Sequence, residues 1–240
     1  MKVTFFCLLL VLLNMYTGQA QERPPGRPTG SVSIGLAYMQ PRSGFRQYYP
    51  NGHAAGTTFG FTVRPQAGYA PLELGAEVSY LLFGIEKHTI GSGSNAYYLK
   101  TTHSFIPLHG LVRLKPGRLT TFNPYLDALA GISIFNSRTK VDEDFFTFLR
   151  DEEPLVIKKH TSVVFNYGLA AGLMYAVNNR KSFFADLRLI YLESPLASYV
   201  KKGDVFIDQN GDATYHLTRS ETSMFMVQLK LTGIINSLSD

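Results

Sequence analysis

The amino-acid sequence predicts an all-β fold: an eight-stranded antiparallel transmembrane β-barrel with long external loops and short periplasmic turns. Three observations support this prediction. Eight segments alternate apolar residues with small or polar ones at a period of two. The chain is 45% hydrophobic and only 17% charged, yet after residue 20 it has no apolar run approaching the ~18 residues of a spanning helix. The links between the eight segments alternate in length, as they do in outer-membrane barrels.

The first twenty residues have the features of a secretory signal peptide. Lys2 precedes an apolar segment at 5–13, and Gly18-Gln19-Ala20 offers a small-x-small cleavage site. The single cysteine, Cys7, lies inside this segment, so the mature chain would contain no disulfide. Three prolines and two glycines make residues 21–30 an extended periplasmic segment. The barrel is then expected over 31–235, with a C-terminal tail at 236–240.

Each expected strand has one uniformly apolar face. In 57–65, for example, the aromatic and aliphatic residues Phe59, Phe61 and Val63 alternate with small or polar ones. The expected strands are 31–40, 57–65, 71–83, 100–115, 123–136, 162–176, 182–192 and 221–234.

The links between these strands alternate in length. Short turns are expected at 65–70, 116–122 and 177–181, and long links at 41–56, 84–99, 137–161 and 193–220. Both chain ends would then lie at the periplasmic end of the barrel. The fourth long link is predicted to contain its own protruding hairpin, with a turn at Asn210-Gly211.

The second face of the strands carries small residues and isolated charges. Eight strands leave just enough width inside a barrel for side chains, so this face is expected to point inward. Four acidic and four basic residues lie on it and predict an interior salt-bridge network: Glu73, Glu77, Asp127, Asp186, Arg64, Arg113, Arg188 and Lys230. The alternative is a soluble lipocalin-like barrel with the apolar face inside, but Gly168, Ala170 and Gly172 in a row are unusual on a solvent-exposed face.

Several stretches resemble the small outer-membrane β-barrel proteins of Bacteroidetes. The resemblance is carried by the arm from Pro71 to Gly84, by residues 109–116 and 123–127, and by Asp186-Leu187-Arg188. It covers nearly all of the mature chain and implies a barrel in the bacterial outer membrane, in a family whose members mostly have unassigned roles. The C-terminus departs from the pattern, because many such barrels end in an aromatic residue and this chain ends in Asp240.

The sequence predicts no metal or cofactor site. His103 and His109 share a strand face but lie six residues apart, about 20 Å along a strand, so they cannot bind one ion together. His109 is better explained as a hydrogen-bonded core histidine. Residues 208–212 resemble the start of an EF-hand loop, but Ala213 and Arg219 occupy positions that require glycine and glutamate.

The most favoured function is non-enzymatic: a membrane-anchored scaffold or accessory subunit that binds a larger outer-membrane complex through its external loops, in contact with outer-membrane lipid and lipopolysaccharide. An exposed aromatic cluster between acidic runs and the acidic ends of the hairpin turn are the candidate contacts: Phe145, Phe146, Phe148, Asp208 and Asp212. No Lys/Arg run is present, which argues against nucleic-acid binding.

Two alternatives remain open at this stage. One is an enzyme acting on envelope lipids at the barrel rim, for which His103 with Ser104, or His53 near Tyr48 and Tyr49, are candidates without a defining motif. The other is a narrow solute pore, which is less favoured because eight charged side chains would fill an eight-stranded barrel.

Overall fold

The computed structural model describes residues 29–42, 46, 52–65, 71–90, 97–115, 120–141, 156–208 and 213–236. The predicted signal peptide at 1–20 and most of the predicted extended segment lie outside the described residues. So do the turn at Asn210-Gly211 and four of the candidate contacts: Phe145, Phe146, Phe148 and Asp212.

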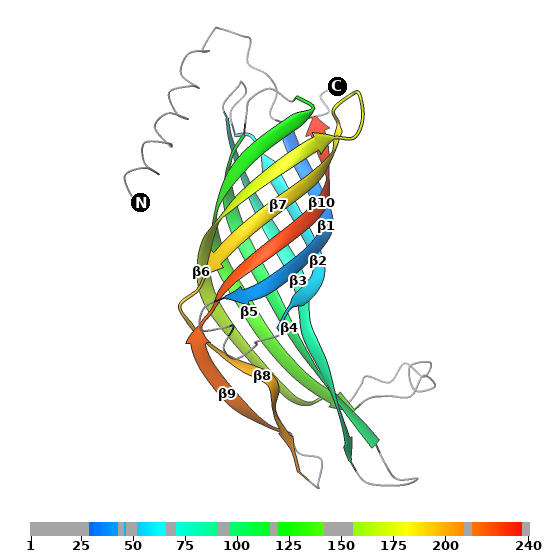
Figure 1. The fold of residues 1–240 in the computed structure, drawn as a ribbon, viewed down its shortest axis with the longest axis vertical. Coiled ribbons are helices and arrows are strands. Elements are labelled where there is room, and N and C mark those ends of the chain that lie inside the picture. Colours follow the sequence, from blue (N-terminus) through cyan, green and yellow to red (C-terminus); the bar gives the residue numbers. More distant parts are fainter. Residues whose placement is uncertain are drawn as a thin grey trace.

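Eight antiparallel strands form one closed barrel, which confirms the predicted fold class (Figure 1). Each strand pairs with its neighbours in sequence, except that β10 lies between β7 and β1 and closes the barrel. The strands are β1 (Thr29–Arg42), β2 (Ala54–Val63), β3 (Leu72–Ile90), β4 (Tyr97–Leu114), β5 (Phe122–Val141), β6 (Val156–Ala176), β7 (Phe183–Glu193) and β10 (Ser223–Asn236). The remaining two strands, β8 (Leu196–Ile207) and β9 (Ala213–Glu221), form a separate hairpin. The sequence predicted this hairpin within the fourth long link.

The short connections all lie at one end of the barrel. They join β2 to β3, β4 to β5 and β6 to β7, and Thr29 at the start of β1 is paired with Asn236 at the end of β10 at this same end. The connections from β1 to β2, β3 to β4 and β5 to β6, and the β8–β9 hairpin, lie at the opposite end, here called the outer end (Figure 1). The connection from β3 to β4, predicted to be long, spans only residues 91–96.

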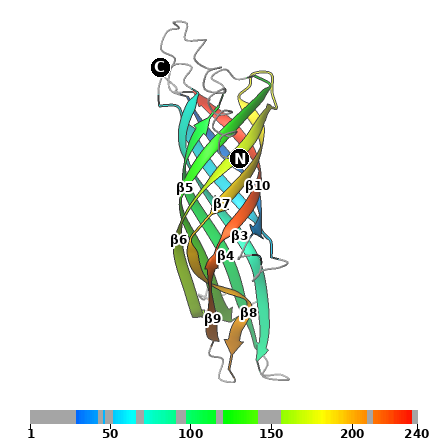
Figure 2. The ribbon, with the colours of Figure 1, turned by 60° about the vertical axis from the view of Figure 1, so that its left-hand side comes forward.

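Strands β3 to β6 are longer than predicted and extend beyond the rest of the barrel (Figure 2). Much of the expected links 84–99 and 137–161 is strand, because β3 continues to Ile90 and β5 to Val141. The prediction was wrong here because both faces of these extensions are largely polar, as in Ser137-Arg138-Thr139-Lys140. Without apolar residues on one face, the period-two signal disappears.

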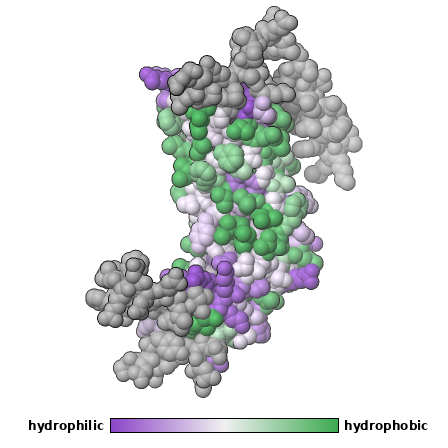
Figure 3. All heavy atoms as spheres, turned by 180° about the vertical axis from the view of Figure 1, so that it is seen from behind, coloured by the Kyte–Doolittle hydropathy of each residue, from purple (hydrophilic) through white to green (hydrophobic). Residues whose placement is uncertain are grey.

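The outer surface of the barrel is apolar and its interior is polar. Leu36, Phe165, Leu169 and Leu229 point outward and are 56–64% exposed, whereas Asp186 is fully buried. A belt of such residues surrounds the barrel and gives way to hydrophilic residues at the outer end (Figure 3). This is the reverse of a soluble barrel and the distribution expected of one that spans a lipid bilayer. None of the described residues forms a helix long and apolar enough to cross a membrane.

Candidate functional site

All eight residues of the predicted charge network lie inside the barrel and make ion pairs with one another. Glu77 on β3 accepts from Arg188 Nη1 on β7 at 2.6 Å and from Lys230 Nζ on β10 at 3.3 Å. The amide of Gln228 also donates to Glu77, at 2.7 Å. These partners come from the opposite side of the barrel wall, so the contacts bridge the interior.

A second carboxylate, Asp127 on β5, binds two arginines. Arg113 donates to it through two nitrogens at 2.8 and 3.0 Å, and Arg188 Nη2 lies 2.5 Å from Asp127 Oδ2. Lys230 extends the chain of contacts to Asp186, whose Oδ2 lies 3.5 Å away. Arg188 therefore joins two carboxylates from two different strands, and it is fully buried.

The network ends near the short turns at Glu73, which pairs with Arg64 at 3.2 Å and with Lys115 at 2.7 Å. The network predicted from the sequence did not include Lys115, because this residue lies at the very end of the expected strand, beside Pro116. The signal was present, since two-residue alternation from the inward-facing Arg113 places Lys115 on the same face.

The side chain of Tyr125 on β5 also contacts residues of the network inside the barrel. Its hydroxyl donates to Asp186 at 2.6 Å, and the Arg113 guanidinium lies 3.7 Å from its ring centroid. The ring lies over Gly172, where any Cβ would clash with it. Each carboxylate of the network thus has at least one cationic partner inside the barrel.

An apolar layer covers the network on the side of the outer end. Met39, Leu81, Phe105 and Met224 belong to one buried cluster that several strands contribute to, and each is fully buried. Inside the barrel, His109 Nε2 donates to Asn166 Oδ1 at 3.0 Å. His109 is therefore a buried, hydrogen-bonded core residue in the structure.

The β8–β9 hairpin covers the inner face of the extensions of β3 to β6. Tyr199 on β8 packs against Phe135, with ring centroids 5.7 Å apart. The Tyr215 hydroxyl lies 2.7 Å from Thr139 Oγ1 and donates to the Lys158 carbonyl at 2.9 Å. The Gly203 N–H donates to Glu86 at 3.0 Å. These contacts attach the hairpin to the barrel at three places.

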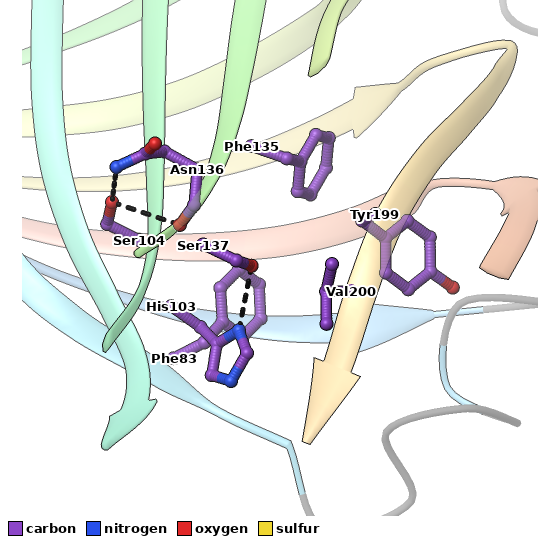
Figure 4. A pocket seen from close by; sticks show the side chains of 8 residues that line it. All are labelled: Phe83, His103, Ser104, Phe135, Asn136, Ser137, Tyr199 and Val200. Atoms are coloured by element: carbon purple, nitrogen blue, oxygen red, sulfur yellow. Dashed lines mark hydrogen bonds between the residues drawn. The ribbon is translucent and has the colours of Figure 1, made fainter. Parts of the chain in front are cut away.

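A small recess lies under the hairpin, lined by Phe83, His103, Ser104, Phe135, Asn136, Ser137, Tyr199 and Val200 (Figure 4). Beside it runs a hydrogen-bonded chain across three neighbouring strands. His103 contacts Glu86 through Nε2 at 2.9 Å and Ser137 through Nδ1 at 2.8 Å. The serine bonded to His103 is Ser137, whereas Ser104, the candidate named in the enzyme alternative, donates to the Asn136 carbonyl at 3.4 Å.

Glu86 lies beyond the apolar belt and has an altered acidity. Burial raises the pKa of this carboxyl, but hydrogen bonds from His103 and the Gly203 N–H, with the charges of His103 and His88, hold its pKa below the usual value. His88 Nε2 lies 3.6 Å from the second carboxylate oxygen. The carboxylate is therefore kept in its ionised, acceptor form.

The other residues considered from the sequence are dispersed. His53 stacks on Tyr38 at a centroid distance of 6.0 Å, and Tyr48 and Tyr49 lie outside the described residues. Asp208 is exposed at the end of β8. Within the described part of the chain, no three His, Cys, Asp or Glu side chains are grouped so that they could hold a metal ion.

Several solved structures are similar to this chain. They include the attachment invasion locus protein Ail of Yersinia pestis (11% identity, TM-score 0.45, 87% of this chain and 99% of that one). Neisserial surface protein A is similar over 86% of this chain and 96% of its own (11% identity, TM-score 0.41). The outer membrane protein OprG of Pseudomonas aeruginosa is similar over 90% and 100% (11% identity, TM-score 0.43). No family model and no curated protein match the chain.

Proposed function

We propose that the protein is a non-enzymatic barrel of the bacterial outer membrane that serves as a membrane-anchored scaffold or accessory subunit. Its short-turn end, with both chain termini, would face the periplasm. The partner would be a larger outer-membrane protein complex that contacts the outer end. We also propose a Bacteroidetes origin for the protein, as the sequence resemblance implies.

One observation carries the proposal: the interior is filled, whereas the outer end is enlarged. Ion pairs and an apolar layer occupy the inside of the barrel, while four extended strands and a separate hairpin build a structure above the belt. A barrel that conducted solute would need the opposite arrangement. The hairpin also exposes Phe206 and Leu217, which are 53% and 55% accessible, and large apolar side chains exposed to water are typical of partner contacts.

Photo-cross-linking on the native cell surface tests the proposal. A photoreactive amino acid replaces Phe206 on the hairpin or, as a control, Leu229 on the lipid-facing side of β10. We expect a discrete protein adduct at position 206 and none at 229. A chain that gives no protein adduct at 206 and purifies as a solitary monomer in mild detergent would contradict the scaffold proposal.

Conductance measurements separate the scaffold from a narrow pore. The purified barrel, inserted into a planar bilayer, is expected to show no stable open state because the ionic network and the apolar layer block the interior. A reproducible open state would favour the pore instead.

A second candidate function is an enzyme acting on envelope lipids, favoured by the Glu86–His103–Ser137 chain. Ser137 Oγ would attack an ester carbonyl, His103 would take its proton and return it to the leaving alcohol, and water would release the acyl group. Mass spectrometry of lipids from cells expressing the wild type or Ser137→Ala decides between the two. A loss of acyl chains that depends on Ser137 would support the enzyme; identical lipids in both strains favour the scaffold.

A further inference from the structure

Basic side chains line the outward face of the strand extensions, directly above the apolar belt. They form what we call the basic ladder: Lys87 on β3, Lys100 on β4, Arg138 and Lys140 on β5, and Lys159 on β6. Their neighbours in sequence Leu99, Thr101, Ser137 and Thr139 are buried on the inner face, so the alternation of the strands directs the ladder outward.

The strand register brings these like charges together. Lys100 lies directly opposite both Lys87 and Lys140, and Arg138 lies directly opposite Lys159. Directly opposed residues have Cβ atoms about 5 Å apart, and like charges at such positions destabilise a sheet. The described outward positions of 98–104, 136–140 and 157–161 include no acidic residue. An anion bound over the opposed cations would relieve their repulsion.

Arg138 has a side-chain nitrogen that an anion could satisfy. Its Nε is shielded from solvent and has no hydrogen-bond partner among the described residues. A shielded guanidinium nitrogen without an acceptor is uncommon, because burial of a polar donor costs free energy unless it is hydrogen-bonded. An oxyanion bound to the guanidinium would supply the acceptor.

The height of the ladder matches the headgroup region of a membrane. Ile134 on β5 and Val163 on β6 belong to the apolar belt, and Arg138 and Lys159 each lie four residues further out. Four residues are about 13 Å along a strand, or about 10 Å along the axis of a barrel tilted by about 40°. The polar layer outside the hydrocarbon core is about 5–7 Å thick on each side. The backbone of the ladder therefore lies at the outer edge of this layer, from which long basic side chains can extend back into it.

We propose that the basic ladder binds the phosphate groups of lipopolysaccharide in the outer leaflet. The ladder crosses four strands, about 14 Å at the usual spacing, so it can contact more than one phosphate on a rigid sugar backbone. Lysine and arginine are the side chains suited to phosphate. The inference rests on the proposed orientation, in which the outer end faces the cell surface.

Thermal unfolding in defined lipid tests the inference without any partner protein. The full chain is reconstituted in phosphatidylcholine nanodiscs with EDTA, and diphosphorylated lipid A, dephosphorylated lipid A or phosphatidylglycerol is added. The test variant is Arg138→Gln with Lys159→Gln, which removes one opposed pair. The control variant, Arg180→Gln with Lys181→Gln, removes two cations from the β6–β7 turn at the other end.

We expect diphosphorylated lipid A to raise the Tm of the wild type and the control, and the test variant to bind at least about tenfold more weakly. Without lipid A, the test variant should unfold at the wild-type temperature or above it, because a repulsive pair has been removed.

Equal binding by both variants, or an equal effect of dephosphorylated lipid A, would overturn the phosphate site. An equal effect of phosphatidylglycerol would overturn the assignment to lipopolysaccharide. The outcome of the cross-linking test of the scaffold does not depend on these results, since no partner protein is present in the lipid experiment.

Discussion

Arg188 is the residue on which the interior depends most. It is fully buried and contacts Glu77 and Asp127, which belong to two different strands. A buried ion pair contributes little net stability compared with an apolar pair, but removing one partner leaves the other charge unpaired at a large cost. A substitution at Arg188 acts through Glu77 and Asp127, each of which loses one of its two cationic partners inside the barrel.

We predict that Arg188→Met lowers the free energy of unfolding by about 3–5 kcal/mol. Denaturant unfolding of the barrel refolded in detergent measures the change. Arg180→Met, an exposed position in the β6–β7 turn, serves as the control and should change stability by less than about 0.5 kcal/mol. Similar values for both variants would show that the interior tolerates unpaired charge.

At the residue scale, the alternation of apolar and polar residues correctly predicted which side chains point outward or inward, but it did not predict contacts between segments distant in sequence. It placed Phe59 and Phe61 outward and Thr58 inward, as the structure has them. It did not predict that the Gly203 N–H binds Glu86, because this contact joins segments distant in sequence and depends on how a hairpin docks. Gly203 has a φ of 90°, a conformation that glycine adopts readily.

At the scale of elements, the polar contacts that attach the β8–β9 hairpin to the barrel include one with an ionisable carboxylate, that of Glu86. The ionised carboxylate of Glu86 accepts from the Gly203 N–H and faces His88 and His103. Because the pKa of Glu86 is held below its ordinary value of 4.5, the contribution of this group to stability is present above that pH. It is lost as the pH falls through the lowered pKa.

We therefore predict that the hairpin loosens from the barrel in acid, below about pH 4.5. Hydrogen exchange of β8 and β9, corrected for intrinsic rates, should show faster exchange there while the barrel strands stay protected. Glu86→Gln should weaken docking already at neutral pH and reduce the acid response, whereas Glu221→Gln on the exposed side of β9 should behave as wild type. An unchanged acid response in Glu86→Gln would show that another group controls docking.

The extensions of β3 to β6 explain why element boundaries were harder to predict than element faces. Within the belt, residues that face lipid are apolar and residues that face the barrel interior are small or polar, so the sequence alternates between the two kinds. Above the belt, one face meets water and the other meets a polar hairpin, as at Thr101 and Thr139, which hydrogen-bond at 2.7 Å. Neither face requires apolar residues, so no periodic signal marks these segments as strands.

At the scale of the whole molecule, the belt sets the position of the barrel in the membrane. Leu169 lies within the belt on β6 and is 58% exposed, and Thr161 is an exposed residue on the same face of the same strand, beyond the belt. The two positions differ mainly in the medium that surrounds them.

We predict that Leu169→Arg destabilises the barrel in lipid by about 2–4 kcal/mol, whereas Thr161→Arg costs about 0–1 kcal/mol. Reversible unfolding from phospholipid vesicles measures both. Equal costs at the two positions would mean that the belt does not face hydrocarbon.

The closure of the barrel by β10 has a consequence for how the chain is made. Lys230 and Gln228, both partners of Glu77, lie on this last strand, and β10 also supplies the edge that pairs with β1. A chain truncated before β10 would have an open seam and would leave Glu77 without two of its partners. The strand that closes the barrel wall is thus also the strand that completes charge neutralisation around Glu77, so we expect closure of the wall and assembly of the ionic interior to occur together.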